Sequence, residues 1–268
     1  VTEFRVVEDG RSMIYINSRR IGEKVWIRNN HFILPNYIEL GNLFEDAEAQ
    51  KYYTRVWFVR WAVPHDDTSS SIFGWRYFYE EVDPKGLGDP SKLGVEGADF
   101  LIGQVGGRPR EEQHRYPGDW EAIMGQRPIA IHAKENLGTT DEGVAMWRKI
   151  CRDALRGKTP HAYPKRANGN GGDSDPMTSY CQDTLFNIPE LDDLKADREM
   201  MREVGRQVTA IVFDGDQFAL KDRKREIRKR LKALEKEFQR GFADSKCEKL
   251  FCSRWSCKFR HTFKHNGW

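Results

Sequence analysis

Three cysteines and a histidine near the end of the chain have a spacing that suits a metal ion. Four residues separate Cys247 from Cys252, four more separate Cys252 from Cys257, and His261 follows after three. Thiolates and an imidazole nitrogen are ligands that tetrahedral Zn²⁺ prefers in structural sites, and a short segment with little core can gain its fold from the metal. The spacing predicts a zinc site, with a disordered tail as the alternative.

Basic and aromatic side chains are interleaved around this Cys-His segment. Lysine and arginine attract phosphates, and aromatic rings stack on the bases of single-stranded nucleic acid. One hypothesis is therefore a zinc-dependent module that binds nucleic acid through the tail, with the body of the chain as a scaffold. The basic residues are Lys246, Lys249, Arg254, Lys258, Arg260 and Lys264, and the aromatic ones are Phe251, Trp255 and Phe259.

The carboxylate of Asp119 is a second candidate for chemistry. It follows Pro117 and Gly118 and precedes Trp120, and proline and glycine are residues that fix a turn. An aspartate in such a turn is most often the N-cap of the next helix, which here would begin at Trp120. The residue types alone favour a cap over a ligand.

The sequence around this turn changes that balance. From His114 to Cys151 the chain reads HRYPGDWEAIMGQRPIAIHAKENLGTTDEGVAMWRKIC, and from Val25 to Pro35 it reads VWIRNNHFILP. These stretches resemble the C-terminal catalytic domain of Rieske-type non-haem iron oxygenases, in the branch that acts on phthalate and vanillate. The resemblance extends over about residues 1–218. The tail more weakly resembles a CCCH zinc finger.

The resemblance implies that Asp119 is the carboxylate ligand of a mononuclear Fe(II), pointing into a hollow formed by a curved sheet. Two histidines and one carboxylate hold such an iron and leave positions open for dioxygen and substrate. The two histidines are expected upstream of Val1, so the chain is expected to be an N-terminally truncated catalytic domain with little activity alone. Glu135 and Asp141 also match family acids in spacing, although Asn136 stands where the family more often has histidine.

The family chemistry is O₂-dependent hydroxylation or demethylation of an aromatic acid, with the protein orienting the ring. Electrons come from a Rieske [2Fe–2S] centre held by two cysteines and two histidines, and a reductase or ferredoxin and a homotrimeric assembly are the implied partners. The matching cysteine–histidine pairs are absent before residue 150. Some aromatic residues could line the substrate cavity, although most are expected to be core: Trp57, Phe58, Trp61, Phe73, Trp75, Tyr77 and Phe78.

The other histidines are weaker candidates. His132 lies in an apolar run and is expected to be a packing residue, and His114 is given little weight as a neighbour of the metal. His31 and His65 lack the close spacing that lets one helix present two ligands, so neither is expected in the site.

Short runs of β-branched and aromatic residues indicate antiparallel strands in the first part of the chain. Turn residues at Asp9-Gly10 and Gly22-Glu23 separate the first three runs. A glycine-rich segment from Pro84 to Gly107 is expected to be a long loop. The expected strands are 2–7, 13–18, 24–28, 55–63 and 71–82.

Three helices are expected further on. The first begins with a capping box formed by Thr139 and Glu142 and is stopped by Gly157 and Pro160. A flexible linker at 167–176 separates it from helices at 191–213 and 222–240. The apolar face of the first helix is Val144, Trp147, Cys151, Ala154 and Leu155; that of the second is Leu194, Met201, Val204, Val208 and Ile211; and that of the third is Ile227, Leu231, Leu234 and Phe238.

Strands followed by helices indicate an α+β fold, and the resemblance implies the helix-grip form of it, a curved antiparallel sheet wrapped on a long helix. Residues 1–219 hold 28 basic and 35 acidic side chains, whereas 220–268 hold 16 and 6. This asymmetry predicts a catalytic-domain fragment at 1–218 and a basic helical extension at 219–268. With 5 cysteines in no disulfide framework, and with no membrane-spanning run or leader, a cytoplasmic location is expected.

Overall fold

A computed structural model describes residues 1–7, 10–41, 47–54, 56–81, 83, 86, 108–159 and 178–247, apart from the side chains of Trp120 and of 242–247. Its centre is one eight-stranded sheet, in which every pairing is antiparallel. The strands are β1 (Thr2–Val6), β2 (Ser12–Ile21), β3 (Lys24–Ile33), β4 (Tyr37–Leu40), β5 (Lys51–Thr54), β6 (Phe58–Pro64), β7 (Ser70–Arg76) and β8 (Gln182–Phe186).

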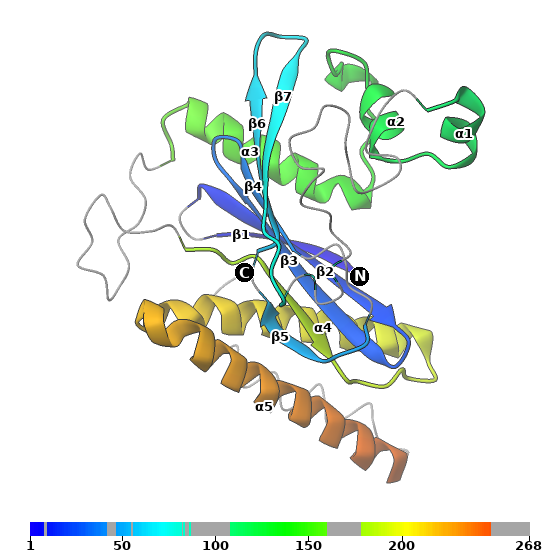
Figure 1. Ribbon diagram of the computed structural model, residues 1–268, viewed down its shortest axis with the longest axis vertical. Coiled ribbons are helices and arrows are strands. Elements are labelled where there is room, and N and C mark those ends of the chain that lie inside the picture. Colours follow the sequence, from blue (N-terminus) through cyan, green and yellow to red (C-terminus); the bar gives the residue numbers. More distant parts are fainter. Residues whose placement is uncertain are drawn as a thin grey trace.

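Helices lie on both sides of this sheet (Figure 1). The α+β arrangement expected from the sequence is therefore present, with strands first and the two longest helices last. The helices are α1 (Arg110–Arg115), α2 (Asp119–Met124), α3 (Glu142–Leu155), α4 (Leu194–Asp214) and α5 (Leu220–Cys247), and short 3₁₀ turns occupy His132–Lys134, Thr139–Asp141 and Gly215–Gln217.

The strand order is β1-β2-β3-β4-β6-β7, and β8 pairs with both β3 and β5. β2 and β3 form the longest hairpin, and the turn between them contains Gly22 with a φ of 53°. Glycine adopts this left-handed conformation without steric cost, so the predicted turn at Gly22-Glu23 is confirmed. The hairpin runs through the middle of the sheet and places residues of β3 next to both β4 and β8.

Three short strands, β4, β5 and β8, were not predicted. β8 is the clearest case, because its five residues, Gln182 to Phe186, are all buried although three of them are polar. It pairs with β3 and β5, which lie far away in sequence. In the other direction, the strand expected at 71–82 ends at Arg76.

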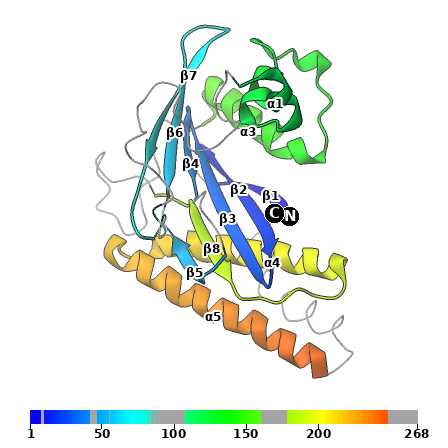
Figure 2. The same ribbon diagram turned by 45° about the vertical axis from the view of Figure 1, so that its right-hand side comes forward.

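One face of the sheet is covered by α4, and α5 packs beside α4 and β5 (Figures 1 and 2). Gly205 lets α4 approach the sheet closely, since an added Cβ there would lie 3.2 Å from Ile16 Cγ2 on β2. The predicted seam of α5 is buried in the same core as Ile14 and Val25 of the sheet. That seam is Ile227, Leu231, Leu234 and Phe238.

The other face is covered in part by α3, whose Trp147, Ile150 and Cys151 pack near Met13 and Phe32. Two predictions for this helix are wrong. Val144 and Leu155, assigned to the apolar face, are exposed.

The predicted capping box of Thr139 with Glu142 is the second error. The side chain that reaches back is that of Asp141, which accepts a hydrogen bond of 2.9 Å from the backbone N–H of Gly138. Because a 3₁₀ turn precedes α3, the cap lies one residue earlier than predicted. The helix ends as expected, with Gly157 at a φ of 67° just beyond its C-terminus.

Glu235 holds α5 to the sheet. Its buried carboxylate accepts hydrogen bonds from Gln50 Nε2, from the hydroxyl of Tyr52 and, at 2.6 Å, from the backbone N–H of Asn187. A buried carboxylate is stable only with such donors, so α5 is fixed in register against β5 and β8. The boundary at 218 stays a prediction, and the described part of the second unit contributes to the core of the first. The expected loop at 84–107, apart from the described residue 86, and the expected linker at 167–176 lie outside the described residues.

Candidate functional site

A cavity of about 340 Å³ opens at the side of β4, β6 and the segment before β8. Glu39 lies in its wall. It is the direct register partner of His31, which in turn lies opposite Ile14, and directly opposed residues project to the same face of a sheet. Ile14 belongs to the core beneath α4, so the cavity lies on the α4 and α5 side. Its lining residues are Tyr37, Glu39, Tyr53, Val56, Val59, Tyr77, Tyr79, Ser179 and Cys181.

Glu39 is the centre of a hydrogen-bond network in this wall. Its Oε2 lies 3.2 Å from His31 Nδ1 and accepts a bond of 2.7 Å from Ser179 Oγ, while Oε1 accepts one of 3.3 Å from the hydroxyl of Tyr37. An ionised carboxylate only accepts hydrogen bonds, so His31 Nδ1 carries the proton. With a relative exposure of 4%, Glu39 depends on these donors to remain buried.

His31 has one nitrogen outside this network. Its Nε2 is buried and has no hydrogen-bond partner among the described residues. The ring lies beside that of Tyr180, with centroids 5.2 Å apart. A buried polar atom without a partner is rare in folded proteins and calls for a functional reason. The sequence prediction set His31 aside because it judged histidines by helical ligand spacing, whereas His31 acts through a cross-strand partner.

Tyr53 forms another part of the wall and is held by α5. Its φ of 54° puts a non-glycine residue in the left-handed region, at the irregularity between β5 and β8. Such strain persists only where the surroundings fix it. Here Arg223 Nη1 donates to the Tyr53 hydroxyl, and Arg223 Nε donates to Asp216 Oδ1 at 3.2 Å. The start of α5 therefore sets the position of this tyrosine.

Behind the cavity wall a second buried carboxylate ties β8 to β3. Asp183 Oδ1 accepts hydrogen bonds from Trp26 Nε1 at 2.8 Å and from Arg28 Nε at 2.9 Å. Gly41 packs directly against this pair, because an added Cβ would lie 2.8 Å from both Arg28 Nε and Asp183 Cγ. The pair fixes the edge of β3 from which Glu39 and His31 are presented.

Acidic groups in the wall other than Glu39 stay protonated. Burial, and then the charge of Glu39, raises the pKa of Tyr37 far above its usual value. Burial also raises the pKa of Tyr53, although Arg223 opposes it, and raises the pKa of the Cys181 thiol, with Glu39 adding to the effect. Glu39 is thus the one charge among the lining residues.

Asp119 is placed elsewhere. It is the first residue of α2, with Gly118 as the N-cap, and its side chain is exposed. Glu121 holds the turn by accepting hydrogen bonds from the backbone N–H of Gly118 at 2.8 Å and from Arg108 Nη2 at 2.6 Å. The expectation that Asp119 points into a hollow of the sheet does not hold, since Asp119 is not among the residues that line the cavity. The alternative, that Asp119 itself is the cap, is also wrong, because the helix begins one residue earlier than expected.

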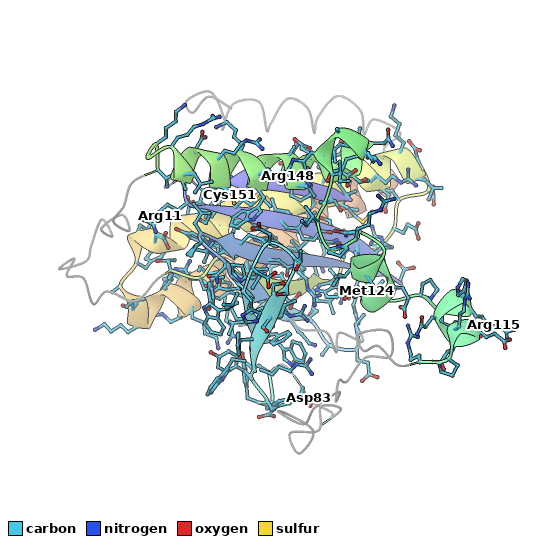
Figure 3. The ribbon with its side chains drawn as sticks, turned by 90° about the horizontal axis from the view of Figure 1, so that it is seen from above. Arg11, Asp83, Arg115, Met124, Arg148 and Cys151 are labelled. Atoms are coloured by element: carbon cyan, nitrogen blue, oxygen red, sulfur yellow. The ribbon has the colours of Figure 1, made fainter. Side chains whose placement is uncertain are left out.

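Both α1 and α2 lie on the α3 side of the molecule, away from α4 and α5 (Figures 1 and 2). Seen from above, Arg115 of α1 is at the periphery, whereas Arg148 of α3 lies over the sheet (Figure 3). Glu135 forms two hydrogen bonds to Arg148, of 2.6 and 2.8 Å, and this pair connects the segment after α2 to α3. Glu135 and Asp141, which match family acids in spacing, thus have structural partners.

The remaining histidines and aromatic residues divide clearly. His65, His114 and His132 are exposed, so His132 is not the packing residue that was expected. Trp57 and Phe58 are buried core, as predicted for most of the aromatic set. Tyr77 is the one of that set that lines the cavity. Trp61, Phe73 and Trp75 are exposed instead of buried.

The predicted zinc ligands lie outside the described residues. Cys252, Cys257 and His261 are not described, and of Cys247 only the backbone at the end of α5 is. Within the described part of the chain, no group of three or more histidine, cysteine, aspartate or glutamate side chains is close enough to hold a metal. The zinc site and its nucleic-acid partner stay predictions.

Comparison with known proteins points to oxygenases. No protein-family model matches this chain. It is 37% identical, over 88% of its length, to the oxygenase subunit of a tert-butanol monooxygenase/tert-amyl alcohol desaturase from Aquincola tertiaricarbonis, and covers 50% of that protein. It is 36% identical, over 17% of its length, to the alpha subunit of a phenoxybenzoate dioxygenase from Ectopseudomonas oleovorans, and covers 11% of it. These relatives support an oxygenation-type function, and the chain spans about half or less of the length of each.

The described helices were also compared with the length and apolarity that a membrane span requires. None of them meets both conditions.

Proposed function

We propose that this chain is part of the catalytic domain of a Rieske-type non-haem iron oxygenase with a helix-grip fold. The observation that carries the proposal is the 37% identity to an oxygenase subunit over 88% of the chain. The Pro117-Gly118-Asp119-Trp120 turn supports it, because the resemblance matches Asp119 to the carboxylate ligand of a mononuclear Fe(II). An α+β fold built on an antiparallel sheet is compatible with this assignment.

The described residues do not form the ligand set of such an iron. A facial triad needs two histidines beside the carboxylate, and no cluster of three ligating side chains exists in the described ranges. We therefore place the two histidines, and the [2Fe–2S] centre that would supply electrons, in protein outside this chain. The half-length match to the monooxygenase subunit supports this placement.

The segment that carries Asp119 has the surface of an element that packs against further protein. Between α1 and α3 it exposes a series of large apolar side chains, whereas exposed apolar surface in soluble proteins is usually scattered. Further protein covering this segment would also enclose the carboxylate. The exposed residues are Tyr116, Ile123, Met124, Ile129, Ile131 and Leu137.

The proposal includes the finer expectations from the sequence. These are a reductase or ferredoxin as electron donor, a homotrimeric assembly and a cytoplasmic location. The phthalate and vanillate branch implies an aromatic acid as substrate, whereas the name of the longer-matching relative gives tert-butanol and tert-amyl alcohol as the compounds it acts on. When bound, the iron would supply the reductive activation of dioxygen, and the protein would orient the substrate.

The test is iron retention and O₂-dependent substrate consumption by the complete protein from which this chain comes. Asp119→Asn should lower both the iron content and the turnover of tert-amyl alcohol at least tenfold, because an amide replaces a charged ligand. Asp67→Asn, at an exposed aspartate in the β6–β7 turn, is the matched control and should change neither. Full iron content and turnover in Asp119→Asn would reject the assignment of Asp119.

A further inference from the structure

We propose that the cavity beside Glu39 binds a small, uncharged compound through a hydroxyl group, with the Glu39 carboxylate accepting the O–H. This inference rests on the proposed function, because it names the substrate class of that oxygenase. It also separates this chain from the aromatic acids that the sequence resemblance implies. Charge, hydrogen-bond capacity and the size of the cavity lead to the same class of ligand.

The charge of the wall disfavours an acid. Glu39 is a carboxylate with a relative exposure of 4%, and no lysine or arginine is among the residues that line the cavity. The nearest guanidinium groups have acidic partners, Arg223 with Asp216 and Arg28 with Asp183. Two anions close together in a poorly solvated site repel strongly. A carboxylate ligand would therefore enter without a counter-charge and against Glu39.

The hydrogen bonds of Glu39 leave room for one more donor. A carboxylate has about four lone-pair positions, and three are occupied by donors from His31, Tyr37 and Ser179. A hydroxyl group brings one O–H, which matches the position that remains. A primary ammonium group brings three N–H donors, and desolvating its charge requires more acceptors than the wall offers. The donor count therefore favours an alcohol over an amine.

The rest of the wall suits an apolar body. Val56 and Val59 and the rings of Tyr37, Tyr53, Tyr77 and Tyr79 surround the space, and the Tyr79 hydroxyl is already used in a bond of 3.3 Å to the backbone oxygen of Val56. Apolar walls with a few placed polar groups are typical of small-molecule sites. At about 340 Å³ the cavity lies near the lower limit of the roughly 300–1,000 Å³ usual for such sites, so a small ligand fits best.

His31 acts as the positioning residue for Glu39. Its Nδ1–H holds Oε2 from directly across the β3–β4 pair, while Ser179 holds the same oxygen from the segment before β8. Two donors from different elements fix the carboxylate plane, so the free lone pair has a set direction. Such pre-organisation lowers the entropy lost when a ligand binds.

The experiment is saturation-transfer NMR on the full 268-residue chain with four compounds that share a branched apolar body. They are tert-amyl alcohol, tert-amylamine, pivalate and neohexane, which carry a hydroxyl, an ammonium, a carboxylate and no polar group. We expect the alcohol to bind most tightly and pivalate to bind least. Equal or tighter binding of the amine, of pivalate or of neohexane would overturn the inference. This ranking is measured on the unaltered chain, so it does not depend on the folding of any variant.

A substitution then locates the site. Glu39→Gln keeps the size of the side chain but removes the charge, and should weaken binding of tert-amyl alcohol about tenfold or more, since a bond to a charged acceptor is lost. Glu23→Gln, at an exposed glutamate in the β2–β3 turn, should leave the affinity unchanged. Unchanged affinity in a folded Glu39→Gln variant would overturn the inference.

Failure here and failure of the proposed function give different results. If the alcohol binds as expected but the complete protein consumes no oxygen with it, the oxygenase proposal fails while the binding site stands. If the complete protein oxidises the alcohol but Glu39→Gln neither weakens its binding nor raises its KM, the site fails while the oxygenase proposal stands.

Discussion

His31 Nδ1 lies 3.2 Å from Glu39 Oε2, and the two residues are direct partners in the antiparallel pairing of β3 with β4. Both side chains are buried. The imidazole and the carboxylate therefore depend on each other, because neither has solvent to replace its partner. The pair lies between the core under α4 and the cavity, so it contributes both to folding and to the proposed binding site.

Replacing His31 with alanine should destabilise the chain by about 2 kcal/mol or more, because a buried carboxylate loses one of its donors. Urea unfolding near neutral pH measures this loss. His65→Ala is the control. His65 is exposed and bonds only Ser71 Oγ in the β6–β7 hairpin, so its loss should cost about 0.5 kcal/mol or less. Equal effects of the two substitutions would show that His31 does not support Glu39.

Replacing Gly41 with alanine should cost about 1–3 kcal/mol, since overpacking a tight site forces its neighbours to move. The new Cβ would lie 2.8 Å from Arg28 Nε and would push apart the pair that Arg28 makes with Asp183. Gly138→Ala is the control, because the nearest atom to its Cβ would be 3.9 Å away. Thermal unfolding compares the two. A cost at Gly41 no larger than that at Gly138 would contradict the close approach.

The strands of the central hairpin could be predicted from sequence, because alternating apolar residues and the turn at Gly22 are local signals. β8 could not. Its Gln182, Asp183 and Thr184 look like loop residues, and only partners distant in sequence, such as Trp26 and Arg28, make their burial possible. Non-local hydrogen bonds leave no periodic signature in the strand itself.

The same limit applies to the candidate site. Glu39 and Ser179 are 140 residues apart in sequence, so no motif joins them, although the short distance from His31 to Glu39 around the turn at Pro35 is a local signal that a hairpin reading could have used. Asp119 was selected by its motif. A motif gives the type of a ligand but not the protein that surrounds it.

The turn before α2 should respond to acid. The pKa of Glu121 is held below its usual value of 4.5, first by the N–H of Gly118 and also by Arg108. A carboxylate with a lowered pKa in the folded state stabilises fully above its usual value and loses that contribution as the pH falls through the lowered value. Hydrogen exchange at the Gly118 amide should therefore be slower than in Glu121→Gln at pH values above about 5. The difference should disappear well below pH 4.5. A difference that persists in acid would mean that the Glu121 carboxylate is not what protects this amide.

Ile131 gives a test of whether further protein covers the segment of Asp119. Its side chain is 47% exposed in this chain, so Ile131→Ser should change the unfolding free energy of the chain by about 0.5 kcal/mol or less. In the complete protein the same substitution should cost about 1–3 kcal/mol, because an apolar side chain that packs against other protein loses that burial. Leu194, also exposed but at the start of α4, is the control, and Leu194→Ser should have a small effect in both proteins. If Ile131→Ser is equally mild in both, the apolar surface between α1 and α3 stays open to solvent. Asp119 would then have no enclosing protein, and its assignment as an iron ligand would lose its physical basis.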